Sequence, residues 1–131
     1  MYSKTCIIDS SVWLALLIEG DSQKEKGLLA IKGKKYSRTL IPECVYAEVL
    51  NVTRIKGGKG SKMTFLQCLD HFHIKITLTN QKIFNLANRL FQTFAKLSFA
   101  DATILAFALD KNLELITFDN YLFKAWNKVK K

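Results

Sequence analysis

The sequence predicts an α/β fold in which a central parallel sheet is flanked by helices on both faces. Short apolar segments rich in β-branched residues alternate with longer segments of helical periodicity, and this order is typical of parallel sheets. No Pro-rich or Ser-rich linker divides the chain. With 131 residues, of which 49% are hydrophobic, the chain can bury one real core. We therefore expect residues 1–131 to form a single domain.

Four apolar segments have the composition of buried strands, with turn or capping residues close to their ends. Because helical segments separate them, we expect these strands to pair in parallel. The expected strands are Thr5–Ile8, Tyr36–Ile41, Ile74–Leu78 and Leu113–Thr117.

Most of the helices expected between these strands have a recognisable start signal. Ser10 or Ser11 can cap the first helix, Pro42 suits a first helical turn, and Asn80 and Ser98 are good caps. The closing lysines, Lys128, Lys130 and Lys131, are expected to form a frayed tail. The expected helices are 10–17, 22–31, 42–55, 61–72, 80–94, 98–109 and 121–129.

The cysteines and the apolar runs exclude several protein classes. Three cysteines without a C-x-x-C pair predict neither a disulfide framework nor a zinc site. The longest apolar run, Val12–Ile18, is too short to span a bilayer, and the N-terminus lacks the features of a signal peptide. We therefore expect a cytoplasmic protein with no membrane partner.

The net charge of +9 leaves two interpretations open. A basic chain of this size attracts polyanions, but a lysine-rich surface can also serve solubility alone. Lys59 and Lys62 belong to the glycine-rich basic segment 56–62, and we expect them to bind the phosphates of a substrate.

Two carboxylates follow the first and the last expected strands. Asp9 comes after the apolar segment that ends at Ile8, and Asp119 closes the segment after Thr117. Ligands of parallel sheets bind beyond the carboxyl ends of the strands, so both acids are expected at the binding edge. Taken singly, each acid is explained equally well as a turn or cap residue.

Glu48 is expected on the inward face of its helix. It lies three residues after Val45 and four before Val52, which places it on the apolar side. A buried carboxylate requires a partner, so it either binds a metal or pairs with Arg54 or Arg89.

Asp101 is also expected to face inward, because Ile104, Leu105 and Ala108 share its side of an almost wholly apolar helix. Ser98 and Asp101 fit the S-x-x-D capping box, which would give the acid a structural role. The two roles are compatible, since a carboxylate has two oxygens.

Taken together, the four acids predict a metal site. Asp9, Glu48, Asp101 and Asp119 provide only oxygen ligands, and this donor set selects Mg²⁺ or Mn²⁺. An acidic cluster on a basic chain suits a phosphodiester substrate that is hydrolysed by a metal-activated water.

The motifs that carry these acids resemble those of the PIN-domain family, in particular its VapC-like toxin branch. The first is Ile7-Ile8-Asp9-Ser10-Ser11, and the second is Tyr46-Ala47-Glu48-Val49. The two most specific are Leu97-Ser98-Phe99-Ala100-Asp101-Ala102 and Thr117-Phe118-Asp119-Asn120-Tyr121-Leu122. They occur in the family's order over nearly the whole chain.

The resemblance implies a PIN-like three-layer α/β/α nuclease domain and an Mg²⁺- or Mn²⁺-dependent endoribonuclease. It implies that Asp9, Glu48, Asp101 and Asp119 are catalytic metal ligands, and that Ser10 and Thr117 support the site. It also implies an RNA substrate, a homodimer and an inhibitory antitoxin protein as partners.

Other protein classes fit less well. A receiver domain needs a second acid beside Asp9, a Rossmann domain needs a glycine-rich first turn, and a haloacid-dehalogenase-like phosphatase needs Asp-x-Asp, where Ser11 stands here. The alternative left open is a catalytically silent PIN-fold module that binds RNA or a partner protein. Trp13 and Trp126 are expected either in the core or at a dimer contact.

Overall fold

The computed structural model of the chain describes residues 4–18, 24–26, 29, 36–56, 61–71 and 74–130. Its four strands form one sheet of order β3-β2-β1-β4, and every neighbouring pair is parallel. This confirms the predicted fold class. The strands are β1 (Lys4–Ile8), β2 (Tyr36–Pro42), β3 (Lys75–Thr77) and β4 (Glu114–Ile116).

Strand β1 lies in the middle of the sheet and is buried on both faces. Ile7 pairs with Leu40 of β2 on one side and with Leu115 of β4 on the other. Cys6, Ile7 and Ile8 are each at most 2% exposed. A continuous apolar run is therefore what this strand requires, because no side of it meets water.

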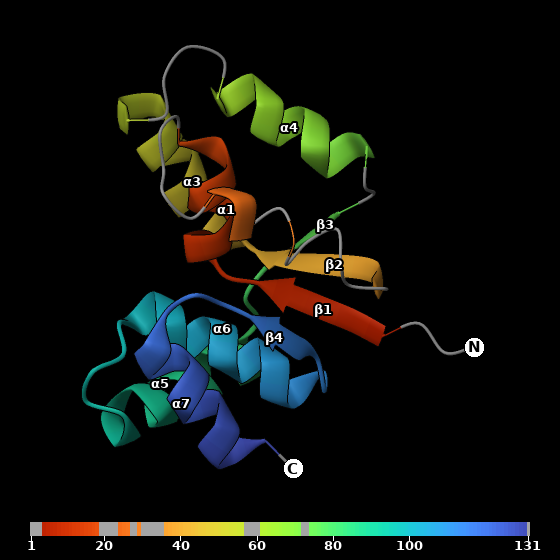
Figure 1. Ribbon diagram of the computed structural model, residues 1–131. Coiled ribbons are helices and arrows are strands. Elements are labelled where there is room, and N and C mark those ends of the chain that lie inside the picture. Colours follow the sequence, from red (N-terminus) through yellow and green to blue (C-terminus); the bar gives the residue numbers. More distant parts are fainter. Residues whose placement is uncertain are drawn as a thin grey trace.

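Helices cover both faces of the sheet (Figure 1). The chain first adds β2 and β3 on one side of β1 and then returns to add β4 on its other side. Because crossovers between parallel strands are right-handed, these two directions put the connecting helices on opposite faces of the sheet. One layer contains α1 (Ser10–Leu17), α3 (Glu43–Lys56) and α4 (Ser61–His71), and the other contains α5 (Gln81–Thr93), α6 (Phe99–Asp110) and α7 (Asn120–Val129).

Helix α6 is the most deeply buried helix among those described. The residues from Ala102 to Ala108 are each at most 4% exposed, as its almost wholly apolar sequence predicts. Trp13 and Trp126 are 2% and 6% exposed and belong to the same core. The core interpretation of both tryptophans is confirmed, and neither forms an exposed dimer contact.

Several element boundaries differ from the predictions. Asp9, not Ser10 or Ser11, caps α1, because the extended backbone of Asp9 points its carboxylate at the first helical amide. Pro42 ends β2, and α3 begins one residue later. Lys128 belongs to α7, which ends at Val129, so the predicted frayed tail is too long.

Three predictions fall wholly or partly outside the described residues. Of the helix expected over 22–31, residues 24–26 and 29 are helical, and the rest lies outside. Lys59 lies outside, and for Lys62 only the backbone, in α4, is described. The proposed phosphate contacts of this segment therefore remain predictions.

Two further findings concern the membrane and the thiols. None of the helices in the described ranges is long and apolar enough to cross a membrane. Cys6, Cys44 and Cys68 form no disulfide in the part of the chain that the structure describes, and Cys6 is buried beside Thr39 as a small core side chain.

Candidate active site

The carboxyl ends of β1 and β4 meet at the point where the strand order reverses. The Asp9 amide donates to the Ile116 carbonyl over 2.9 Å, which joins the first residue after β1 to the last residue of β4. Open parallel sheets hold their ligands at such a switch point. Asp9 and the segment Thr117–Asp119 therefore lie where the fold offers a site.

Asp9 is a buried carboxylate, 2% exposed, with a fixed orientation. Its Oδ1 accepts from the Ser10 amide over 2.8 Å. Its Oδ2 accepts from the hydroxyls of Ser11 and Thr117, each over 2.8 Å. These three donors offset part of the cost of burying the charge and hold the carboxylate in place.

Ser10 connects Asp9 to Glu48. Its Oγ lies 3.0 Å from Glu48 Oε1 and 3.4 Å from Asp9 Oδ1. A hydroxyl has one hydrogen, and the shorter distance favours donation to Glu48. One acceptor position of Asp9 Oδ1 then stays open, and Glu48 is tethered to the same edge of the sheet.

Thr117 and Ser11 connect Asp9 to the loop that carries Asp119. The Thr117 hydroxyl donates to Asp9 and accepts from the Asp119 amide over 3.0 Å. The Ser11 hydroxyl donates to Asp9 and accepts from the Phe118 amide over 3.1 Å. Ser11 is a supporting residue that the sequence analysis did not single out. The second serine after a strand-end acid was its only sequence signal.

Glu48 does not point into the core as predicted; it is exposed. The buried stripe of α3 runs through Val45, Val49 and Thr53, and Val52 is only half-buried. Glu48 therefore lies on the flank of the stripe, where the hydroxyl of Ser10 reaches it. The alternative of an ion pair is not seen either: within the described ranges, the one ion pair joins Lys82 to Asp110.

Asp101 is half-buried in the first turn of α6, and the predicted capping box is present. Ser98 caps the helix by accepting from the Asp101 amide over 3.1 Å. The pKa of the Asp101 carboxyl is nevertheless raised, from 3.8 to about 6, mainly by burial and further by the negative charges of Asp9 and Asp119. Hydrogen bonds from Ser98 oppose this rise in pKa but do not cancel it.

Asp119 caps α7, as its turn interpretation predicts. Its Oδ1 accepts from the amides of Tyr121 and Leu122 over 2.9 and 3.1 Å. Among the described residues Oδ2 accepts no hydrogen bond, so this oxygen is available to a ligand. The cap fixes the carboxylate at the edge that also holds Asp9.

The chemistry of the donor set fits a hydrated Mg²⁺ or Mn²⁺. The acids offer oxygen only, and the pKa of Asp101 is raised mainly by burial and further by the negative charges of Asp9 and Asp119. In the part of the chain that the structure describes, no three His, Cys, Asp or Glu side chains are gathered closely enough to enclose an ion. The four predicted acids therefore lie at one edge of the sheet without forming a closed set of ligands.

A cation also lies at this edge. The Lys26 ammonium is 4.9 Å from the centre of the Phe118 ring, and Phe118 lies between Thr117 and Asp119. This contact fixes a positive charge near the acids. Lys26 could not be predicted from the sequence, because the segment around it carries no motif.

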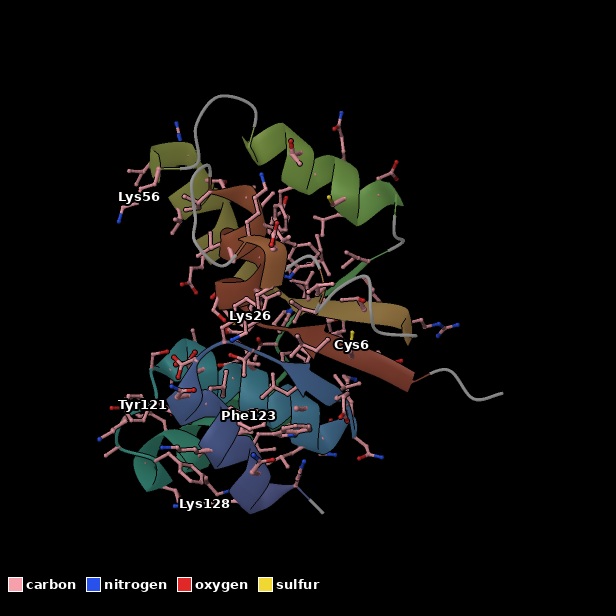
Figure 2. The ribbon with its side chains drawn as sticks, viewed as in Figure 1. Cys6, Lys26, Lys56, Tyr121, Phe123 and Lys128 are labelled. Atoms are coloured by element: carbon pink, nitrogen blue, oxygen red, sulfur yellow. The ribbon has the colours of Figure 1, made fainter. Side chains whose placement is uncertain are left out.

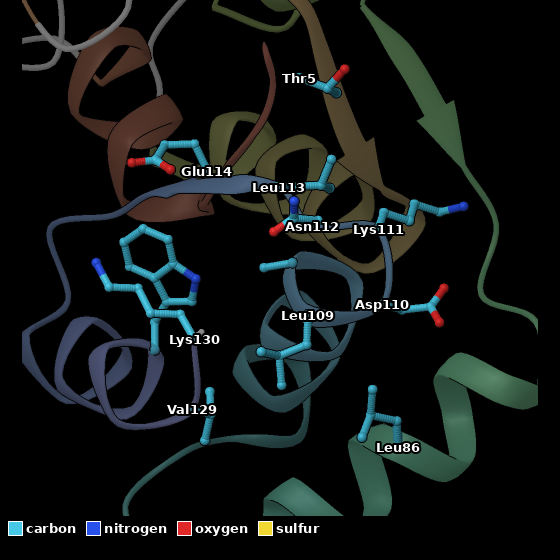
Figure 3. A pocket seen from close by; sticks show the side chains of 12 residues that line it. Thr5, Leu86, Leu109, Asp110, Lys111, Asn112, Leu113, Glu114, Val129 and Lys130 are labelled. Carbon is cyan, nitrogen blue, oxygen red and sulfur yellow. The ribbon is translucent and has the colours of Figure 1, made fainter.

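A cavity of about 1000 Å³ lies at the opposite end of the sheet, where β1 and β4 begin (Figure 3). Thr5, Asn112 and Glu114 line it, together with residues from the ends of α6 and α7. None of the four predicted acids lines this cavity. The volume of a cavity is therefore a poor guide to the active site of this protein, and the network of acids at the carboxyl edge of the sheet is the better candidate.

Replacing Thr117 with Val should weaken metal binding about 10- to 100-fold, because Asp9 loses a donor that orients it. The free energy of unfolding should also fall by about 1–2 kcal/mol, since the Asp119 amide loses its acceptor. Calorimetric titration with Mn²⁺ and thermal melts in EDTA measure the two effects. The matched control is Thr53→Val, whose hydroxyl bonds only to backbone carbonyls of its own helix. Equal losses in both variants would assign Thr117 a purely local role.

Comparisons with known proteins agree with this architecture. The sequence model of the family described as PIN domain matches residues 6–128. No curated protein sequence matches the chain.

Several solved structures share the fold. A toxin–antitoxin complex from Klebsiella pneumoniae superposes with a TM-score of 0.73 at 23% identity, covering 90% of this chain and 89% of that one. VapC20 of Mycobacterium tuberculosis, described as a sarcin–ricin loop cleaving toxin, gives 0.72 at 19% identity, covering 92% and 94%. FitAcB from Neisseria gonorrhoeae gives 0.70 at 16% identity, covering 93% of each chain. At these identities the likeness shows the fold.

Proposed function

The chain belongs to the PIN domain family, and from this premise we propose that it is an Mg²⁺- or Mn²⁺-dependent endoribonuclease. Residues 1–131 form the nuclease domain. Asp9, Glu48, Asp101 and Asp119 are the proposed metal-binding and catalytic acids, with Ser10, Ser11 and Thr117 as positioning residues. RNA is the proposed substrate, and Lys59 and Lys62 are proposed to bind its phosphates.

The observation that carries the proposal is the hydrogen-bond network at the switch point, in which Ser10 joins Asp9 to Glu48 and Thr117 joins Asp9 to the loop of Asp119. The pKa of Asp101, raised mainly by burial and further by the charges of Asp9 and Asp119, agrees with a position beside these acids. A protein that needed only helix caps would not gather unneutralised acids at one edge, because their repulsion destabilises the fold. A divalent cation removes that repulsion.

The residues of the chain have distinct tasks in this proposal. A bound Mg²⁺ or Mn²⁺ would supply charge neutralisation and an acidified water. Asp9 holds its orientation through Ser11 and Thr117, and Ser10 keeps Glu48 beside it. Asp101 and Asp119 are held by their helix caps, which fixes the geometry before the substrate arrives.

Cleavage of structured RNA by the purified chain should require metal. EDTA should abolish cleavage, and added Mn²⁺ or Mg²⁺ should restore it, because the proposed nucleophile is a water that only a bound metal acidifies enough. Gel analysis of end-labelled RNA with and without the chelator measures the effect. Cleavage that persists in EDTA, or RNA binding without any cleavage in either metal, would contradict the proposal. The second result would favour the silent PIN-fold module.

We further propose that the chain is the toxin of a toxin–antitoxin pair and forms a homodimer. The toxin role is supported by the similarity of its fold to that of a toxin–antitoxin complex and of VapC20. The homodimer is proposed from the family resemblance alone. The half-buried carboxylates of Asp101 and Asp119 offer a binding place for a cationic side chain of an antitoxin.

A further inference from the structure

A groove of about 280 Å³ lies beside the acidic edge, between the α5–α6 connection and α7. We propose that this groove binds a single-stranded RNA segment next to the scissile phosphate. Tyr121 stacks on a base, and Lys96, Lys124 and Lys128 bind the phosphates. The inference rests on the proposed function for RNA as the substrate, and it adds the form of the RNA and the surface that holds it.

The groove is continuous with the candidate site at both of its walls. The Tyr121 amide donates to Asp119 Oδ1 over 2.9 Å, so this wall begins at an acid. Leu97 lines the other wall, and the next residue, Ser98, caps the helix that carries Asp101. RNA lying in the groove would therefore enter the acidic edge between Asp101 and Asp119.

The charge of the groove complements a nucleic acid backbone. Lys96, Lys124 and Lys128 line it, and none of its described lining residues carries a carboxylate. All three lysines are exposed, and within the described ranges none of them forms an ion pair. Their positive charge is therefore available to phosphates.

The spacing along α7 arranges these groups in a row. Tyr121, Lys124 and Lys128 follow one another at three and four residues, which places them on one side of the helix. Figure 2 shows Tyr121 and Lys128 at the two ends of this row. The row starts next to Asp119 and runs away from the acidic edge, as a strand leaving the scissile phosphate would.

Tyr121 adds a surface for an unpaired base. The residue is 51% exposed, and the Lys96 ammonium lies 4.7 Å from the centre of its ring. This contact restrains the ring and brings a phosphate-binding charge to its side. Bases stack on exposed aromatic rings only when they are not paired, so the surface favours single strands over a duplex.

Binding in EDTA, where no cleavage occurs, tests the groove separately from the nuclease activity. The probe is a short, unstructured, fluorescently labelled RNA, and fluorescence anisotropy gives its affinity over a range of KCl concentrations. Lys124→Ala/Lys128→Ala should lower the slope of log affinity against log salt by about 1.4, since each phosphate contact on a single strand contributes about 0.7. Tyr121→Ala should weaken binding at least about fivefold with an unchanged slope, and Tyr121→Phe should bind normally.

The matched control is Lys75→Ala/Lys111→Ala, which removes the same charge from exposed lysines of β3 and of the α6–β4 turn. It should change the affinity less than about twofold, because distant surface charges are screened. Equal losses of RNA affinity in both double variants would overturn the proposal that the groove binds RNA. An absence of RNA binding by the folded chain would also overturn it. A blunt RNA duplex that binds as tightly as the single strand would do the same.

The failures of the two proposals are distinguishable. If RNA binds through the groove but is not cleaved with metal, the proposed nuclease activity is rejected and the proposed RNA-binding groove is kept. If metal-dependent cleavage occurs but the groove variants bind RNA as the wild type does, the proposed groove is rejected and the nuclease activity is kept.

Discussion

Replacing Asp9 with Asn is expected to reduce metal-dependent cleavage about 10³-fold, because divalent ions contribute several kcal/mol to such reactions. The fold should also lose stability. In the wild type, the hydroxyls of Ser11 and Thr117 both donate to Asp9 Oδ2 and already accept from backbone amides. An amide nitrogen at that position leaves their hydrogens without an acceptor, which costs about 1–3 kcal/mol.

The measurements for Asp9→Asn are end-labelled RNA cleavage with Mn²⁺ and thermal melts in EDTA. Asp70→Asn is the matched control, because it makes the same chemical change at an exposed residue of α4. The control should keep both cleavage and melting temperature. Cleavage by Asp9→Asn within about tenfold of the wild type would remove this acid from the chemistry.

Replacing Asp101 with Asn is expected to abolish metal-dependent cleavage but to stabilise the metal-free protein. The folded pKa of Asp101, about 6, is higher than its unfolded value of 3.8, so the folded state binds the proton more tightly. The stability linked to this proton is therefore present below pH 3.8 and is lost as the pH rises through about 6. At pH 7.5 the ionised acid destabilises the fold, on the order of 1 kcal/mol after allowance for solvent screening.

Thermal melts in EDTA at several pH values test this linkage. Asp101→Asn should melt a few degrees above the wild type at pH 7.5, and the difference should shrink towards pH 5. Added Mn²⁺ should reverse the order, since only the wild type gains stability by binding the ion. Asp70→Asn, which makes the same chemical change at an exposed residue of α4, is again the control. A pH-independent difference, or equal stabilisation of both variants by Mn²⁺, would show that Asp101 does not hold the ion.

The opposite stability effects of the two substitutions follow from their surroundings. Asp9 is surrounded by donors that require a carboxylate, whereas Asp101 faces burial and two like charges. If both variants lose activity while their metal-free stabilities shift in opposite directions, the loss comes from removal of the metal site and not from unfolding. The result would also show that Asp101 is the acid whose repulsion by its neighbours a cation relieves.

The predictions that succeeded depended on local sequence. Apolar runs such as that ending at Ile8 form strands because their side chains suit a sheet buried on both faces. Asn80 and Ser98 cap their helices because a short polar side chain reaches the free amides of the first turn. The strand-end positions of Asp9 and Asp119 follow from the alternation of strands and helices, and this alternation is visible in the sequence.

Helical periodicity predicted that Glu48 faces the core, and this prediction is wrong. Val45 and Val52 place it on the apolar side, but α3 packs through Val45, Val49 and Thr53, so the carboxylate lies on an exposed flank. Two adjacent faces of a helix can be almost equally apolar, and the position of the neighbouring elements decides which face is buried.

The alternation of strand and helix segments predicted the parallel α/β architecture, and neighbours within a few residues predicted the two acids at strand ends and the cap of Asp101. Only the tertiary structure brings together the hydroxyls and acids that lie far apart in the sequence. It joined Ser10 to Glu48 and Thr117 to Asp9, pairs separated by 38 and 108 residues. It also brought Lys96 beside Tyr121, which created the basic groove. Contacts between distant segments depend on strand order and helix packing, which residue spacing does not encode.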